Sequence, residues 1–236
     1  MRKLNTVLAV IFDMDGLMLD TERIALRSLA AAATELGYPW REEIGLAMVG
    51  LNARDSDAIV ARHLGPEYPP EPLRAVFNKT YAAAIEAGPI TVKTGLIELL
   101  DWLEKNHVPK AVATSTRHER ARFKLDRAGI GRRFSIIVGG DQVARGKPAP
   151  DIYFAAAAGL GIAAEQCLAL EDSSPGVRAA IAAGMRVIMV PDVIPPSPDV
   201  VALGHLILPS LSDVRAWLAG EASVSQRTMD SDSRCA

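Results

Sequence analysis

The sequence contains very little cysteine. Its 236 residues include two cysteines, Cys167 and Cys235, which lie far apart along the chain. Secreted domains that depend on disulfides are much richer in cysteine, so this pattern predicts no disulfide framework. The apolar run near the N-terminus ends at Asp13 without a small-residue cleavage site, which argues against a secretory signal peptide. A reducing, cytoplasmic setting is therefore expected.

The sequence also lacks an excess of either charge and any long apolar run. It carries 26 Lys and Arg against 28 Asp and Glu, with no basic stretch. Nucleic-acid-binding proteins usually show a basic patch or stripe, so no nucleic-acid partner is expected. No apolar segment reaches the ~20 residues that span a bilayer, so no membrane partner is expected either. No apolar surface stripe is left over, which predicts a monomer.

One stretch, Val7–Glu22, combines a buried strand with acidic residues. Its first residues, Val7–Phe12, are all apolar, as expected for a central parallel strand covered by helices on both faces. Asp13, Asp15 and Gly16 follow directly. Because ligands of open α/β sheets bind beyond the carboxyl ends of the strands, both acids are expected at the functional end of the sheet. The alternative is that they only stabilise a turn.

The later part of the chain alternates between strands and helices. Strands are predicted over Lys110–Thr114, Ser135–Val138, Gln166–Leu170, Arg186–Val190 and Leu206–Leu208, with helices between them and a last helix over Leu211–Leu218. This alternation predicts a parallel sheet with right-handed crossovers. Between residues 19 and 92 only helical periodicity occurs, over about 21–36, 42–48, 55–64 and 72–87.

The predicted fold class is therefore α/β, with a Rossmann-like parallel sheet and an inserted all-helical cap. Residues 1–19 and 91–220 are expected to form the core, and residues 20–90 the cap. Residues 221–236 lack apolar periodicity and are expected to form a disordered tail.

Polar side chains also follow the other predicted strands. Thr114 and Ser115 end one strand, Lys147 lies in the loop after the next, and Glu171 and Asp172 end a third. Each has a simpler interpretation, as a helix cap, a surface lysine or acids that complement a helix dipole. Their coincidence at successive strand ends favours one site, with acids for a hard cation, hydroxyls and amides for phosphate oxygens, and a lysine for excess negative charge.

This set of residues suits phosphoryl transfer. A carboxylate such as Asp13 can attack phosphorus when a cation such as Mg²⁺ removes the repulsion between the two anions. A second acid must protonate the departing alkoxide and later deprotonate water, and Asp15 is placed for this role. The run Gly140–Lys147 resembles a P-loop but has one residue too many between its glycines, and Pro148 replaces the required Ser or Thr.

The motifs together resemble those of the haloacid dehalogenase-like superfamily. Its first to fourth motifs match, in order, FDMDG at Phe12–Gly16, ATST at Ala113–Thr116, the lysine of GKPAPD at Gly146–Asp151 and LEDSSPGV at Leu170–Val177. The resemblance covers most of residues 7–190. The insertion point is similar to that of the subclass with a small helical cap, which includes phosphatases of sugar phosphates and nucleotides and the β-phosphoglucomutases.

The resemblance implies a role for each matching residue. Asp13 is implied to be the nucleophile that becomes an aspartyl-phosphate, and Asp15 the general acid and base. Thr114 and the Ser115 amide are implied to hold phosphate oxygens, and Lys147 to neutralise charge near Asp13. The implied Mg²⁺ ligands are Asp13, the backbone carbonyl of Asp15, Glu171 and Asp172, of which Asp172 is the firmer expectation for a direct ligand. The acid at position 15 favours phosphate esters, because the dehalogenases of the superfamily lack it.

The cap departs from the mutase pattern. The mutases carry a histidine where this chain has Ala25, and their Gly-x-x-Arg loop corresponds here to Gly50–Arg54, which is one residue longer. Asn52 and Arg54 in this loop, and Arg117 after the second motif, are expected to contact substrate, although Arg54 fits an exposed position at a helix start equally well.

These features predict a Mg²⁺-dependent phosphatase that acts on a small phosphorylated metabolite, either a sugar phosphate or a nucleotide-like ester. The alternatives are a phosphosugar mutase and a non-catalytic binding protein on the same scaffold.

Overall fold

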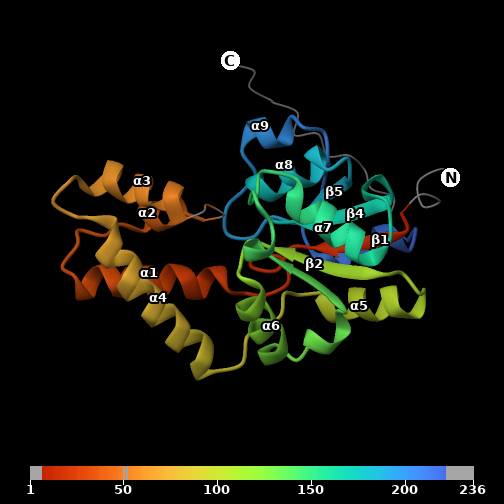
Figure 1. Cartoon of the computed structure of the whole chain (residues 1–236), viewed down its shortest axis with the longest axis horizontal. Coiled ribbons are helices and arrows are strands. Elements are labelled where there is room, and N and C mark those ends of the chain that lie inside the picture. The colour runs from red at the N-terminus through yellow and green to blue at the C-terminus, as the bar shows by residue number, and fades with distance from the viewer. Residues whose placement is uncertain (1–6, 50, 52, 222–236) are drawn as a thin grey trace, which may run out of the picture.

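The computed structural model describes residues 7–49, 51 and 53–221. Figure 1 shows a sheet covered by helices, with helices α1–α4 forming a separate group to one side. Asn52, the predicted tail after Glu221 and Cys235 within it lie outside the described residues. Among the helices described, none is both long and apolar enough to cross a bilayer.

The core is a parallel sheet in the order β3-β2-β1-β4-β5-β6. Its strands are β1 (Ala9–Phe12), β2 (Lys110–Thr114), β3 (Ile136–Gly139), β4 (Cys167–Glu171), β5 (Arg186–Met189) and β6 (Leu206–Ile207). All four residues of β1 are fully buried, because helices cover both faces of the sheet. Val10 and Phe12 belong to one apolar cluster and Ala9 and Ile11 to the other.

The helices of the core form a layer on each face of this sheet. One cluster packs β1 against α5 (Leu96–Lys105), α6 (His118–Arg127) and α10 (Leu211–Leu218), and the other packs it against α7 (Asp151–Leu160), α8 (Ser174–Ala182) and α9 (Pro198–Val201). The strand order reverses beside β1, which has β2 on one side and β4 on the other. Such switch points are where open α/β sheets bind ligands.

The inserted helices have a small core of their own. They are α1 (Glu22–Glu35), α2 (Glu42–Leu46), α3 (Ala53–Leu64) and α4 (Pro70–Ala87). Their buried side chains include Ala32, Ile44, Val60 and Leu73. The two linkers to the sheet run side by side: the Asp20 amide donates to the Thr91 carbonyl at 2.9 Å, and the Lys93 amide to the Met18 carbonyl at 2.8 Å.

The predicted fold class is confirmed, with small errors in the elements. Helix α4 begins at Pro70, two residues earlier than predicted. Proline fits the first turn of a helix because an amide there needs no intrahelical partner. The four-residue helix α9 was not predicted, since so short an element has no measurable periodicity.

Candidate active site

Three acids meet at the carboxyl ends of β1 and β4. These strands are neighbours, and their register pairs Phe12 with Leu170, so Asp13 lies beside Glu171. Asp13, Glu171 and Asp172 are all buried, and each offers a carboxylate oxygen within 4.8 Å of the others. The structure therefore brings together the side chains of three of the predicted metal-binding residues.

Lys147 reaches this acidic cluster from the loop between β3 and α7. Its side chain is only 4% exposed. The Nζ atom donates to Asp13 Oδ1 at 2.5 Å, to Glu171 Oε1 at 2.6 Å and to the Ala113 carbonyl at 3.0 Å. One ammonium group is thus shared between two carboxylates and a carbonyl.

The acids outnumber the cation, and the electrostatics reflect this. Burial raises the pKa of Asp13 to about 7, and Lys147 only partly opposes the shift. Burial also raises the pKa of Asp172 well above its usual range, helped by the charges of Asp13 and Glu171. Although burial opposes it, the two neighbouring acids raise the pKa of Lys147. Three ionised carboxylates and one ammonium group leave a net negative charge that a divalent cation would balance. Carboxylate oxygens are also the ligands that suit a hard cation.

The carboxylate of Glu171 is already engaged by protein donors. Its Oε1 accepts from the Tyr153 hydroxyl at 2.5 Å as well as from Lys147. Its Oε2 accepts from the amides of Asp172 and Ser173 at 3.2 and 3.4 Å, and from the Ser173 hydroxyl at 3.1 Å. Among the described residues, Asp172 has no comparable set of donors. Asp172 is therefore freer to bind a cation, whereas Glu171 orients Lys147.

Asp15 lies on the other side of Asp13 and has a lysine of its own. Its Oδ1 accepts from the Thr21 hydroxyl and from Lys124 Nζ, both at 2.7 Å, and its Oδ2 accepts from the Thr116 hydroxyl at 2.7 Å. Although burial opposes it, the Lys124 ammonium lowers the pKa of Asp15. The sequence reasoning missed Lys124. Its spacing with the buried Ala121 and Leu125 on α6 places it on an apolar helix face, and that is the signal that could have identified it.

The predicted phosphate-binding and substrate-binding residues differ in how deeply they are buried. Thr114 is buried at the end of β2, where its hydroxyl accepts from the Thr116 amide at 3.1 Å, and Ser115 is exposed beside it. The Arg117 side chain is 83% exposed and lies 3.9 Å from Asp141. Arg54 is exposed at the start of α3 and lines neither of the cavities described below.

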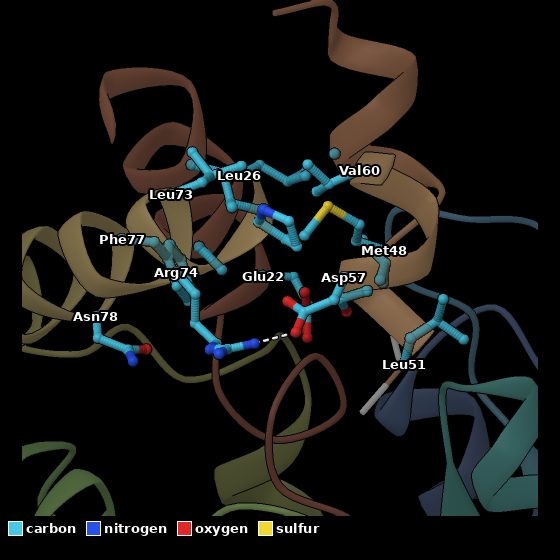
Figure 2. A pocket seen from close by; sticks show the side chains of 16 residues that line it. Glu22, Leu26, Met48, Leu51, Asp57, Val60, Leu73, Arg74, Phe77 and Asn78 are labelled. Carbon is cyan, nitrogen blue, oxygen red and sulfur yellow. Dashed lines mark hydrogen bonds and ion pairs between the residues drawn. The ribbon is translucent and has the colours of Figure 1, made fainter. Parts of the chain in front are cut away.

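A cavity of about 290 Å³ lies among the cap helices. Much of its wall is apolar, with contributions from Leu26, Leu29, Met48, Val60, Leu73 and Phe77. Arg74 on α4 forms an ion pair with Asp57 on α3, and Figure 2 shows apolar side chains gathered on one side of this pair. The lining also includes Ala25, at the position where mutases carry histidine. A second cavity, of about 410 Å³, lies between Val49 and Leu51 of the cap and Asp172 of the core.

Glu22, at the start of α1, lies between the cap cavity and the acids at the strand ends. It lines that cavity. A Cβ atom at Gly16 would lie 3.2 Å from Glu22 Cγ and 2.2 Å from Asp172 Oδ2, so only glycine allows this close approach. Burial, followed by the charge of Asp15, raises the pKa of Glu22 to about 7. The sequence reasoning did not select Glu22, because a first-turn glutamate is ordinary in helices.

Known proteins are similar to this chain in sequence and in fold. A phosphorylated carbohydrates phosphatase from Thermotoga maritima is 30% identical over 182 residues, which cover 75% of this chain and 82% of that protein. Hexitol phosphatase A from Escherichia coli strain K12 is 33% identical over 181 residues, covering 76% and 81%. A haloacid dehalogenase family hydrolase from Deinococcus radiodurans R1, solved with phosphate and sodium bound, superposes with a TM-score of 0.77 at 30% identity, covering 92% and 96%.

The match to the family itself extends over most of the chain. The family model described as haloacid dehalogenase-like hydrolase matches residues 10–190, a span that begins within β1, ends just after β5 and includes the inserted helices. The same span holds every residue of the acidic cluster and both lysines. The chain therefore belongs to the haloacid dehalogenase-like hydrolases.

Proposed function

We propose that the protein is a phosphatase that hydrolyses a small phosphorylated carbohydrate or a related hydroxylated phosphate ester. The observation that carries this proposal is the pair of acids Asp13 and Asp15. One lies in a buried acidic cluster with Lys147, and the other is held apart by Lys124. The relatives named above, which include two phosphatases, support the same activity.

In this proposal Asp13 and Asp15 divide the reaction between them. An Asp13 carboxylate oxygen bonds to phosphorus as the ester P–O bond breaks, and the departing alkoxide takes a proton from Asp15. Because Lys124 lowers the pKa of Asp15, that acid takes up this proton when the negative charge of the bound substrate lies beside it. Water then gives a proton to Asp15 and its oxygen bonds to phosphorus. The bond between phosphorus and Asp13 breaks, which releases inorganic phosphate and restores the carboxylate. The Thr114 hydroxyl and the Ser115 amide bind the phosphoryl oxygens.

The proposed cofactor is Mg²⁺. Asp13, Asp172 and the backbone carbonyl of Asp15 would hold it, and Glu171 would complete the site by keeping Lys147 in place. When bound, Mg²⁺ supplies the positive charge that lets a carboxylate approach a phosphate group. The raised pKa values of Asp13 and Asp172 support this proposal, because burial and the neighbouring carboxylates raise them more than Lys147 lowers them, and a bound cation would offset both effects.

The cap cavity is proposed to hold the part of the substrate beyond the phosphate. Glu22 would accept hydrogen bonds from hydroxyl groups near the reacting end, and the apolar wall would pack against the carbon skeleton. The Arg74 charge is neutralised by Asp57, so the described residues that line the cavity offer no free cation for a second phosphate. We therefore expect a monophosphate substrate. Substrate contacts by Arg117, Arg54 and Asn52 stay predictions.

The test is phosphate release from a panel of phosphomonoesters, measured with Mg²⁺ and with EDTA. The panel spans hexose and pentose phosphates, hexitol phosphates, glycerol phosphate and nucleoside monophosphates. Mg²⁺-dependent release from hydroxylated monophosphates is expected, and Asp13→Asn should abolish it while the protein still folds. Turnover by that variant, once deamidation is excluded, would refute the mechanism. Isomer interconversion with little free phosphate would favour the mutase instead.

A further inference from the structure

The structure assigns a positioning role to Lys124 and Tyr81. Lys124 holds the carboxylate of Asp15 in place, and Tyr81 ties Lys124 to the cap. This inference rests on the proposed function, since it requires Asp15 to be the general acid and base. Neither residue belongs to the four motifs that identify the family, and neither touches the acidic cluster.

Lys124 is buried in a way that requires a partner. Its side chain is 3% exposed and extends from α6 into the interior, where its Nζ lies 2.7 Å from Asp15 Oδ1. A buried ammonium group is retained in folded proteins when it is paired and hydrogen-bonded, and Asp15 supplies that pairing. The interaction joins residues 109 positions apart in the sequence.

Asp15 is fixed by donors from three separate elements. Thr21 comes from the first cap linker, Thr116 from the loop after β2 and Lys124 from α6. Donors from three elements fix the orientation of the Asp15 carboxylate plane as well as the position of the group. Each acid of the pair thus has its own lysine, because Lys147 contacts Asp13 and Glu171.

Tyr81 brings the cap into this network. It lies on α4, and Lys124 Nζ is 5.1 Å from the centroid of its ring. The Tyr81 hydroxyl also lies close enough to Lys124 for each group to shift the pKa of the other. Helix α6 is fastened to the end of α4 as well: Arg127 donates to the carbonyls of Glu86 and Gly88 at 2.9 and 2.6 Å. Figure 1 shows the end of α4 approaching α6.

A displaced Asp15 should damage the two half-reactions unequally, depending on the leaving group. The p-nitrophenolate ion leaves as a stable anion and needs little help from an acid. Formation of the aspartyl-phosphate from p-nitrophenyl phosphate therefore tolerates a misplaced Asp15. Hydrolysis of the aspartyl-phosphate does not tolerate it, because a base must still take the proton of the attacking water. The expected signature is a burst of p-nitrophenolate followed by slow turnover.

The experiment compares Lys124→Met with wild type, Asp15→Asn and the control Lys110→Met in stopped-flow assays with p-nitrophenyl phosphate. Lys110 pairs with Glu104 at 2.9 Å on the far side of the core and takes no part in the site. Lys124→Met should show a stoichiometric burst at nearly the wild-type rate and a steady-state kcat lower by about 100-fold. Its KM should fall as well, because kcat/KM reports the first half-reaction, which is nearly unchanged. Asp15→Asn should show the same pattern, and Lys110→Met should match wild type.

Tyr81→Phe is the milder variant, and it keeps the inference testable if Lys124→Met fails to fold. It should show the same burst with a loss of about 3- to 10-fold in steady-state kcat. If the burst rate of Lys124→Met falls as much as its steady-state rate, Lys124 supports the whole site and the positioning role is overturned. Tyr81→Phe at wild-type kcat would overturn the link to the cap. If Asp15→Asn itself shows no burst, the acid–base role in the proposed function fails first.

Discussion

Replacing Asp13 with asparagine is expected to stabilise the folded protein while it abolishes turnover. Burial, partly opposed by Lys147, raises the pKa of Asp13 from 3.8 to about 7. Because one pKa unit corresponds to about 1.4 kcal/mol, keeping this carboxylate ionised in the folded protein costs about 4 kcal/mol. Asparagine has the same shape without the charge, so Asp13→Asn avoids this cost. In the proposed function, the site thus loses stability in order to hold an ionised nucleophile.

The stability that Asp13→Asn gains over the wild type should increase as the pH rises. Between about pH 4 and pH 7 the folded protein holds a proton at Asp13 more tightly than the unfolded chain does. The free energy of unfolding of the wild type therefore falls through this window as the pH rises, whereas that of Asp13→Asn lacks this contribution. In a protein of this size 1 kcal/mol shifts Tm by about 2–4 °C, so the variant should melt about 10 °C higher near pH 8.

Thermal unfolding followed by circular dichroism in EDTA, near pH 5 and near pH 8, measures this difference. The exposed Asp126 supplies the control, since Asp126→Asn should shift Tm little at either pH. Added Mg²⁺ should raise the Tm of the wild type more than that of Asp13→Asn, because the ion needs the carboxylate. A variant that melts at or below the wild type at both pH values would refute the electrostatic reasoning, as would a difference that does not grow with pH.

Two further substitutions test the surroundings of the acids. Gly16→Ala should lower the free energy of unfolding by about 1–2 kcal/mol, because φ is +87° and the new Cβ would lie 2.2 Å from Asp172 Oδ2. It should also weaken Mg²⁺-dependent phosphate release, and wild-type activity would contradict this. Asp57→Asn should raise kcat/KM for sugar bisphosphates relative to monophosphates by about tenfold, because it frees Arg74. Arg74→Met in the same background should cancel the gain, and an unchanged ratio would argue against the assignment.

Much of the fold could be predicted because its signals are local. The run before Asp13 is apolar on both faces, so it had to be a central strand with helices on each side. The alternation of strands and helices predicted a parallel sheet, which the structure confirms. In such a sheet the strand ends share one edge, so Asp13, Lys147 and Glu171 could be grouped before their contacts were known.

The cap was harder to interpret for its function. Helical periodicity indicated that residues there were buried, but it did not say against which partners. Arg54 and Arg117 were candidates for substrate contacts because of their motif positions, yet both side chains are exposed. Arg74, which lines the cap cavity, carried no such signal, and its pairing with Asp57 depends on how α3 and α4 cross.

The sequence by itself determined the order of strands and helices, the place of the insertion and which acids follow the strands, because each depends on neighbouring residues along the chain. Tertiary structure alone decided that Lys124 would pair with Asp15 and that Tyr81 of the cap would contact Lys124. It also decided that Glu22 would lie between the cap cavity and the acids at the strand ends. The physical reason is that a buried charge requires a partner, and that partner is chosen by the packing of elements far apart in the chain.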